Sequence, residues 1–426
     1  MSALLKAIKF VSSNSELMNT AILKDDLMAP EVVADPHSYY RTLRENERVH
    51  WNERWKGWVL TGYKEVVDVL RDPENFSSDR MGYLEKELSQ EEQESIAPIF
   101  HVLKYWMVFR DPPEHTVLRM LLNKLFTPVA IERYRPMVRK IVQKALDKVV
   151  HTGKMEVIRD FAYDIPMSVI LELIGAPDLD RDKIKEWSEA IGVFFFIKAD
   201  EPRRREIACE GINSLVEYIT PLIQQRRDHP GIDLISLLIS AEEAGQITYN
   251  DVLATCVLLI FGGHETTMNL IANGTLALME HPEQWEILRD NPVFLKRAVE
   301  ELLRYDGSVK STVRWAKKDV MVGDKLVKQG ERLLVSLSGA NRDPLQFENP
   351  DTLDVTRDPN LHVAFAHGIH VCLGASLARM EAEEAFAGLI KRITCPKVDE
   401  DAYLNYYPSV VHRALKNLPV TFHAIK

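Results

Sequence analysis

The chain has 426 residues, of which 46% are hydrophobic and 27% are charged, and its formal net charge is −10 at pH 7. This is the composition of an ordinary globular protein, and it excludes disordered and fibrous classes. The acidic balance gives no general attraction to nucleic acid or to anionic membranes, although it does not exclude a local basic patch. The four cysteines form no C-x-x-C pair, which argues against a zinc ribbon, a dithiol redox site and a disulfide framework.

Strand signals are few, and helical patterns dominate the chain. Residues 49–51 and 58–60 flank a polar turn and predict a hairpin, and Gly323-Asp324 lies at the turn of a second one. The further strand candidates are residues 320–322, 325–327, 333–337 and 419–422. Apolar residues at helical spacing predict helices over residues 130–150, 165–174, 184–197, 212–226, 234–243, about 250–280 and 292–305.

The organisation of the chain favours one large domain. No linker, low-complexity block or internal repeat stands out, and no apolar run is long enough to cross a bilayer or to form a signal peptide. We therefore expect a cytoplasmic protein that is mainly α with small β-sheets, in the α+β class.

The long helix predicted over about residues 250–280 contains a polar interruption, GGHETT, at residues 262–267. Two glycines inside a helix cost about 1 kcal/mol each relative to alanine. An acid and two hydroxyls directly after an apolar run are also costly to bury without partners, which indicates a function for them. Glycines let a flat ligand lie against the helix, and threonine hydroxyls bond the carbonyls of the preceding turn and open a local kink. Taken alone, Glu265 is equally well an ordinary surface acid, and we expect His264 to be structural or solvent-facing.

Cys372 lies in the segment FAHGIHVCLG, residues 365–374, just before a helix predicted to begin near residue 375. The helix dipole and free amide donors at such a position favour a thiolate. Gly368 and Gly374 allow a positive φ or a close approach to a flat cofactor, and Phe365 can pack against the sulfur or the cofactor. The alternative is a buried, inert cysteine in a glycine-rich turn.

The spacing F-x-x-G-x-x-x-C-x-G resembles the cysteine-ligand loop of the cytochrome P450 family, the haem-thiolate monooxygenases. The resemblance implies that Cys372 is the axial ligand of haem b (iron protoporphyrin IX), where a thiolate favours O–O cleavage. Many relatives have glycine at the position of Ala366, and we expect the methyl group to be a small change. The resemblance implies a single-domain triangular fold of the soluble bacterial type over residues 35–426, with residues 1–34 as an N-terminal extension packed on it.

The interrupted helix resembles the oxygen-binding groove of this family. The resemblance implies that Thr266 holds the bound dioxygen and the water beside it, that Glu265 relays protons from solvent, and that Gly263 lies against the haem. General acid delivery is what heterolytic O–O cleavage requires.

Four further residues match the contacts that this family makes to the haem propionates. His115 and Arg119 are four residues apart and share one face of a predicted helix, and Arg314 and His370 stand in the two other matching segments. Arginine suits bidentate recognition of a carboxylate. Any one of these residues alone would be read as a surface charge.

Glu301 and Arg304 lie three residues apart on one helix face. Alone, such a pair is usually an ordinary surface ion pair. Its place between the long helix and Cys372 resembles the ExxR motif of the family, and Arg357 is the candidate third member. The resemblance implies a structural triad that supports the cysteine loop.

The segments that form the substrate pocket in this family are mostly apolar here, which implies an apolar or amphipathic substrate. For Phe195, core packing or a lid hinge is an equal alternative. For Lys310 we favour an exposed side chain; facing the cavity, it would meet a substrate carboxylate. The candidate pocket residues are Phe195, Leu259, Gly262, Val309, Lys310 and Val411.

The sequence has no flavin, nicotinamide or iron–sulfur motif, so we expect electrons from separate proteins, a ferredoxin and a ferredoxin reductase. The cationic candidates for their docking face are Lys124, Arg379, Lys391 and Arg392.

The resemblance predicts a monooxygenase that hydroxylates or epoxidises a small molecule, for which a natural-product intermediate of secondary metabolism or a fatty acyl compound is expected. The alternatives are an oxidase that makes C–C or C–N bonds, a peroxide-driven peroxygenase and a non-catalytic haem sensor. The Glu265–Thr266 pair favours oxygen activation over peroxide use, because it supplies a proton relay.

Overall fold

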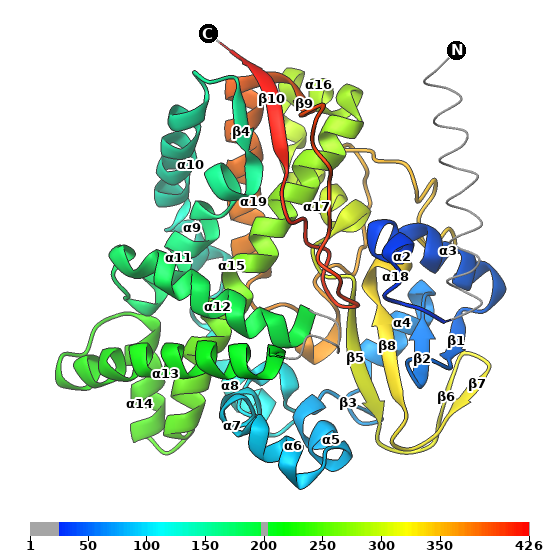
Figure 1. Ribbon diagram of the computed structural model, residues 1–426, viewed down its shortest axis with the longest axis vertical. Coiled ribbons are helices and arrows are strands. Elements are labelled where there is room, and N and C mark those ends of the chain that lie inside the picture. The colour runs from blue at the N-terminus through cyan, green and yellow to red at the C-terminus, as the bar shows by residue number, and fades with distance from the viewer. Residues whose placement is uncertain (1–24, 197–202, 426) are drawn as a thin grey trace.

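The computed structural model describes residues 25–196 and 203–425. Helices make up most of the molecule, and the strands gather mainly to one side of them (Figure 1). The helices are α2 (Pro30–Ala34), α3 (Pro36–Asn46), α4 (Tyr63–Arg71), α5 (Arg80–Glu87), α6 (Gln90–Ser95), α7 (Ala97–Leu103), α8 (Glu114–Asn123), α9 (Pro128–Glu132), α10 (Arg135–Val149), α11 (Asp164–Ile174), α12 (Arg181–Phe196), α13 (Arg204–Asp228), α14 (Leu234–Glu243), α15 (Tyr249–Glu280), α16 (Pro282–Asp290), α17 (Leu295–Asp306), α18 (Leu337–Asn341) and α19 (Ala375–Arg392).

The longest helix, α15, runs through the middle of the helical part (Figure 1). It starts in a capping box, in which Thr248 and Asp251 satisfy each other's backbone amides. It ends before Pro282, which opens α16 because proline suits the first turn of a helix. The interruption at residues 262–267 does not break α15, which is continuous from Tyr249 to Glu280.

Three sheets complete the fold. The order in the largest is β1-β2-β8-β5-β3, the second is β4-β10-β9, and β6 and β7 form a separate hairpin. Both predicted hairpins are present, with Val49 opposite Leu60 in the first and Val320 opposite Val327 in the second. The strands are β1 (Val49–Asn52), β2 (Gly57–Leu60), β3 (Phe76–Ser77), β4 (Lys154–Glu156), β5 (Ser311–Ala316), β6 (Val320–Val322), β7 (Lys325–Val327), β8 (Arg332–Ser336), β9 (Ile393–Val398) and β10 (Pro419–Ala424).

The helix predicted over residues 130–150 is two helices, α9 and α10. Pro136 stands in the first turn of α10, and a proline ring there prevents α9 from continuing through it. The helix predicted over residues 184–197 is α12, and residue 197 lies outside the described residues.

The main core is formed by apolar side chains of α10, α11, α13, α15 and α19. The described part of the predicted N-terminal extension begins at residue 25, where Leu27 and Val32 pack with Tyr39, Leu43 and Val59; residues 1–24 lie outside the described residues. Within residues 25–196 and 203–425, none of the helices combines the length and apolarity that a membrane span needs.

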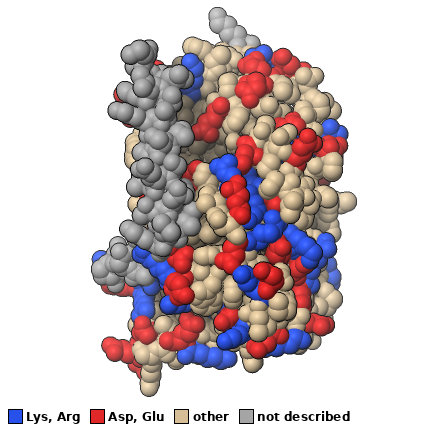
Figure 2. All heavy atoms as spheres, turned by 90° about the vertical axis from the view of Figure 1, so that its right-hand side faces the viewer, with Lys and Arg blue, Asp and Glu red and all other residues tan. Residues whose placement is uncertain are grey.

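Figure 2 shows the face on the right-hand side of Figure 1. Basic and acidic side chains are interleaved over this face, and basic ones gather near its middle. A mixed surface of this kind fits the modest net charge of −10 and offers no broad basic field for a polyanion.

Candidate active site

One cavity brings together residues from α15 and from the loop before α19. Cys372 lines it from the loop, and Gly262 and Thr266 line it from α15. Most of the remaining lining is apolar and includes Ile170, Leu258, Leu259, Val309, Leu337 and Leu377. The cavity therefore places a cysteine sulfur and a threonine hydroxyl in one largely apolar chamber.

The loop before α19 holds Cys372 in a tightly turned backbone. The Cys372 amide donates to the Phe365 carbonyl over 2.9 Å, and Gly368 has a φ of +71°. A Cβ on Gly368 would collide with the backbone of Leu70, so the position requires glycine. Ala366 has a φ of +59°, which costs an L-residue about 1–2 kcal/mol. Alanine in place of the glycine of many relatives therefore adds backbone strain at this position.

The surroundings of the Cys372 thiol act on its pKa in both directions. Burial raises this pKa, whereas the Gly374 amide, Arg119 and Arg379 lower it. The amide donor expected at a helix N-terminus is therefore present. The pKa of the thiol is nevertheless raised in the protein alone, because the effect of burial is larger than that of these groups.

The glycines expected near a cofactor differ in what they do. A Cβ on Gly374 would meet open space, and one on Gly262 would touch only the Leu258 side chain, at 3.9 Å. A Cβ on Gly263 would collide with Ile170 of α11. Gly262 and Gly374 thus leave room beside the cavity, whereas Gly263 lines it and also lets α11 approach α15 closely.

The four predicted propionate contacts form one electropositive group, in which His115 and Arg314 are buried and Arg119 and His370 are half-buried. The rings of His115 and His370 lie 4.2 Å apart between centroids, and Arg119 and Arg314 line the cavity with His370. Burial and the neighbouring arginines lower the pKa of His115 to about 4 and that of His370 to about 2. Burial lowers the pKa of Arg314 to about 10.

Both ring nitrogens of His115 and Nε2 of His370 are buried without a hydrogen-bond partner among the described residues. A neutral imidazole has one N–H donor, and an unpaired donor of this kind beside the buried Arg314 and the half-buried Arg119 suits anionic oxygens, because a buried polar group loses free energy unless it is paired. This observation fits the carboxylates of a haem.

Thr266 and Glu265 are neighbours in α15 with different surroundings. The Thr266 hydroxyl donates to the Gly262 carbonyl over 3.0 Å, which is the predicted bond to the preceding turn. Glu265 lines a second cavity of about 920 Å³, together with Glu189 of α12 and Tyr407. Burial, with a smaller contribution from Glu189, raises the pKa of Glu265 to about 8. His264 is structural: it is buried, and its Nδ1 contacts the Ile260 carbonyl at 2.7 Å.

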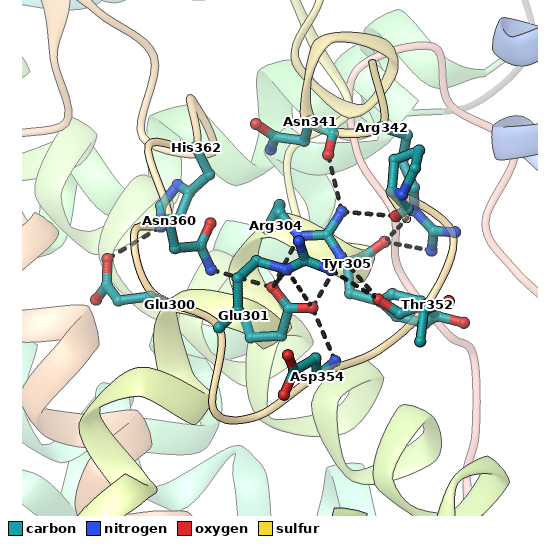
Figure 3. A network of polar contacts seen from close by, with 12 residues as sticks. Glu300, Glu301, Arg304, Tyr305, Asn341, Arg342, Thr352, Asp354, Asn360 and His362 are labelled. Atoms are coloured by element: carbon teal, nitrogen blue, oxygen red, sulfur yellow. Dashed lines mark hydrogen bonds and ion pairs between the residues drawn. The ribbon is translucent and has the colours of Figure 1, made fainter. Parts of the chain in front are cut away.

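Glu301 and Arg304 are fully buried and joined by two hydrogen bonds, of 2.7 and 2.8 Å (Figure 3). Arg357 adds contacts of 3.1 and 3.2 Å to the same carboxylate. Arg304 also donates to the carbonyls of Asn341, Pro350 and Thr352. The three predicted residues therefore meet and tie α17 to the segment that leads to the cysteine loop.

The candidate pocket residues divide into three groups. Leu259, Gly262 and Val309 line the cavity that contains Cys372. Val411 is not among its lining residues; its carbonyl accepts the Lys310 amide at 2.7 Å. The side chain of Phe195 lies outside the described part of the structure.

The expectation that Lys310 is exposed is wrong. Its side chain is buried, with a relative exposure of 3%, because residues 409–413 cover β5. Burial and the nearby Arg413 lower its pKa to about 7. Lys310 is not among the residues that line the Cys372 cavity.

The four docking candidates also differ. Arg379 bonds Glu300 twice, at 2.6 and 2.9 Å, and Arg392 bonds Asp147 at 2.8 Å. These partners neutralise both guanidinium charges. Lys124 and Lys391 are exposed and form no ion pair with another described residue.

Sequence reasoning missed two acids next to this site, Glu189 and Glu381. Glu381 is fully buried on α19, and the Thr267 hydroxyl of α15 is the polar group that acts on its carboxyl. Burial raises its pKa well above the ordinary value. The available signal was its spacing, since Glu381 lies four residues from Leu377 and from Ala385, both in the core.

The fold and this cavity define a haem-thiolate oxidoreductase. The family model described as Cytochrome P450 matches residues 58–402. The chain is 38% identical over 397 residues to the biotin biosynthesis cytochrome P450 of Bacillus subtilis, covering 92% of this chain and 97% of that protein. It is 35% identical to the cytochrome P450 monooxygenase PikC of Streptomyces venezuelae, covering 92% of each.

The fold is similar to the crystal structure of P450BioI in complex with an acyl carrier protein ligated to hexadec-9Z-enoic acid. The TM-score is 0.85 and the identity 37%, over 92% of this chain and 99% of that one. The chain belongs to the cytochrome P450 family. It is a monooxygenase of that family, and its cofactor is haem, which the family holds by a cysteine thiolate.

Proposed function

We propose that this cytochrome P450 inserts one oxygen atom into an unactivated C–H or C=C bond of an apolar or amphipathic small molecule, with Cys372 as the iron ligand. The observation that carries the proposal is the shared cavity, in which Cys372 and Thr266 face a largely apolar space. Haem bound at Cys372 would supply the activation of dioxygen, which a thiolate ligand promotes.

The electropositive group of His115, Arg119, Arg314 and His370 would hold the haem propionates. Two guanidinium groups provide bidentate donors, and the histidine ring nitrogens provide further ones. Phe365, Gly263 and Gly374 would contact the ring system, and the absence of a Cβ at Gly374 leaves space for it.

Glu265 and Thr266 would deliver protons to the reacting oxygen. A carboxyl group with a pKa of about 8 still carries its proton at pH 7 and can release it when needed. Thr266 lines the reaction cavity, and its hydroxyl is positioned by the Gly262 carbonyl. Glu301, Arg304 and Arg357 would act only structurally, by holding the scaffold of the cysteine loop.

We propose a fatty acyl or similar natural-product intermediate as substrate. Lining residues such as Ile170, Leu259 and Val309 suit a hydrocarbon chain. Similar proteins carry the descriptions biotin biosynthesis cytochrome P450, P450BioI in complex with an acylated carrier protein, and polyketide biosynthesis cytochrome P450. These descriptions support an acyl substrate, free or attached to a carrier.

The test is an optical titration of the ferric haem protein with hexadec-9Z-enoic acid, the same acyl group on an acyl carrier protein, and a macrolactone. Displacement of water from the iron would shift the haem from low to high spin. We expect a shift with at least one acyl ligand. A shift with the macrolactone alone would contradict the acyl proposal, and a larger shift with the carrier-bound ligand would assign that form.

For electron supply we propose a ferredoxin and a ferredoxin reductase, with Lys124 and Lys391 on the docking face. Recognition of a ferredoxin depends largely on charge. The charge reversals Lys124→Glu and Lys391→Glu should therefore slow reduction of the haem protein by the ferredoxin and weaken the dependence of that rate on salt. A matched Lys64→Glu variant on α4 controls for net charge. Reduction rates equal to those of the control would refute this face.

A further inference from the structure

Two cavities meet α15 at consecutive residues. Thr266 lines the cavity that contains Cys372, and Glu265 lines the second one, of about 920 Å³. The walls of the second cavity come from α12, α13 and α15, and from residues 156–159 and 407–417. A second face of α15 thus borders a chamber lined by several charged residues, with Glu265 in its wall.

Glu189 of α12 lines this chamber together with Glu265. Lys185 lies one turn earlier on α12, 3.8 Å from Glu189, and its ammonium group also lies 4.4 Å from the centre of the Tyr163 ring. Negative charge on both Glu189 and Glu265 acts on the Tyr407 phenol and, with burial, raises its pKa. One phenol therefore lies within electrostatic reach of both carboxyl groups.

An unpaired acceptor stands beside Glu265. Asn269 follows it by four residues on the same helix face and lines the same chamber. Its Oδ1 is buried and has no hydrogen-bond donor among the described residues. A protonated carboxyl group at Glu265 provides a donor next to this oxygen, whereas a carboxylate would add a second acceptor.

Like charges in this chamber oppose ionisation of both acids. Burial and Glu189 raise the pKa of Glu265, and burial and Glu186 raise that of Glu189, while Lys185 lowers the latter. The titratable and charged groups around Glu265 are Lys185, Glu186 and Glu189 of α12, Glu210 of α13, His264 of α15, Glu156, Arg159, Tyr407, His412 and Lys416. Of these, Glu189 is the one whose negative charge, after burial, raises the pKa of Glu265.

We propose that Glu189 is a positioning residue that keeps a proton on Glu265, from across the second cavity that both carboxyl groups line. The proposal rests on the relay role given to Glu265 above. Glu189 itself touches neither substrate nor haem, and it acts through Glu265.

The test is an infrared pH titration of the ferric haem protein, in which the carbonyl band of protonated Glu265 is assigned by its loss in Glu265→Gln. In Glu189→Gln the titration midpoint of Glu265 should fall by about one pH unit, a tenfold change in proton affinity. The matched control is Glu186→Gln, which removes an acid from the same helix and the same chamber. Its midpoint should stay within a few tenths of a unit of the parent value.

An unchanged midpoint in Glu189→Gln, or a fall equal to that in Glu186→Gln, would overturn the pairing. The titration needs no turnover, so it decides the pairing independently of the relay. If Glu265→Gln kept full coupling of electron use to product, the relay would fail, while the midpoint would still report on Glu189. With both intact, the alkaline decline of coupling should move to lower pH in Glu189→Gln.

Discussion

Glu265 and Thr266 are adjacent in α15, yet their side chains line different cavities. Consecutive residues of a helix point about 100° apart, so one turn of α15 can separate the two chambers. The proposed relay would therefore pass a proton between two adjacent residues of one helix. The glycines at residues 262 and 263 reduce the bulk of the helix at that point.

Replacement of Thr266 by valine should uncouple electron use from product formation. The hydroxyl is lost and the volume is kept, so binding of an apolar substrate should change little, while product per electron falls about tenfold or more, in the range of general-acid effects. Thr275→Val is the matched control, because Thr275 makes the same bond to its preceding turn, at 2.7 Å, but is buried away from the cavity. Full coupling in Thr266→Val would contradict the relay.

Coupled turnover should depend on the protonation of Glu265. A carboxyl group whose pKa is raised to about 8 carries its proton below that pH and loses it above. We therefore expect the coupled rate to be level near pH 7 and to fall as the pH rises through about 8. Glu265→Gln should lower the rate and remove this alkaline decline. Persistence of the same decline in Glu265→Gln would assign it to another group.

Removal of the Glu301 carboxylate should destabilise the protein strongly. Arg304 would keep its buried charge without its carboxylate partner, and Arg357 would lose the same partner. Removing one member of a buried ion pair typically lowers the free energy of unfolding by about 3–5 kcal/mol. Denaturant unfolding of Glu301→Ala measures this cost. Asp68→Ala removes the exposed partner of Lys64 and should leave the midpoint unchanged. Similar midpoints for the two variants would show that the triad adds little to stability.

The residues of this triad illustrate what the sequence makes predictable. Glu301 and Arg304 are placed on one helix face by their spacing, and Arg357 was expected from the resemblance to the family's ExxR motif. Likewise Leu259, Gly262 and Val309 were expected at the pocket and line it. Such residues are recognisable because their roles depend on local spacing or on a short motif.

Lys310 and Glu189 were not predictable in this way. The burial of Lys310 depends on residues 409–413, a hundred positions away, which cover β5. Glu189 matters because α12 is packed so that it shares a chamber with α15. In both cases the environment arises from long-range packing, which no local pattern encodes.

Glu381 should make the protein less stable as the pH rises. Its folded-state pKa is raised well above the unfolded value of about 4.3, so the folded state binds the proton more tightly. Stability should then fall by about 1.4 kcal/mol per pH unit between the two pKa values, and Glu381→Gln should remove that slope. Thermal or denaturant unfolding at several pH values measures it.

Glu384, three residues further along α19, should affect the pH dependence of stability in the opposite direction. It bonds Arg135 and Arg139, and its pKa is lowered despite burial. Its contribution is present above the unfolded pKa and is lost as the pH falls through the folded one, so Glu384→Gln should be destabilising at neutral pH. A parallel pH dependence for Glu381→Gln and the parent protein would contradict the buried, protonated state of Glu381.

Ligation of the haem by Cys372 is tested directly by the ferrous–carbon monoxide spectrum. The parent protein should show the red-shifted Soret band that marks a thiolate opposite carbon monoxide. The band should persist in Cys395→Ser, which changes an exposed cysteine of β9, and disappear in Cys372→Ser at comparable haem content. A red-shifted band that survives in Cys372→Ser, or its absence from the haem-loaded parent protein, would contradict the central claim.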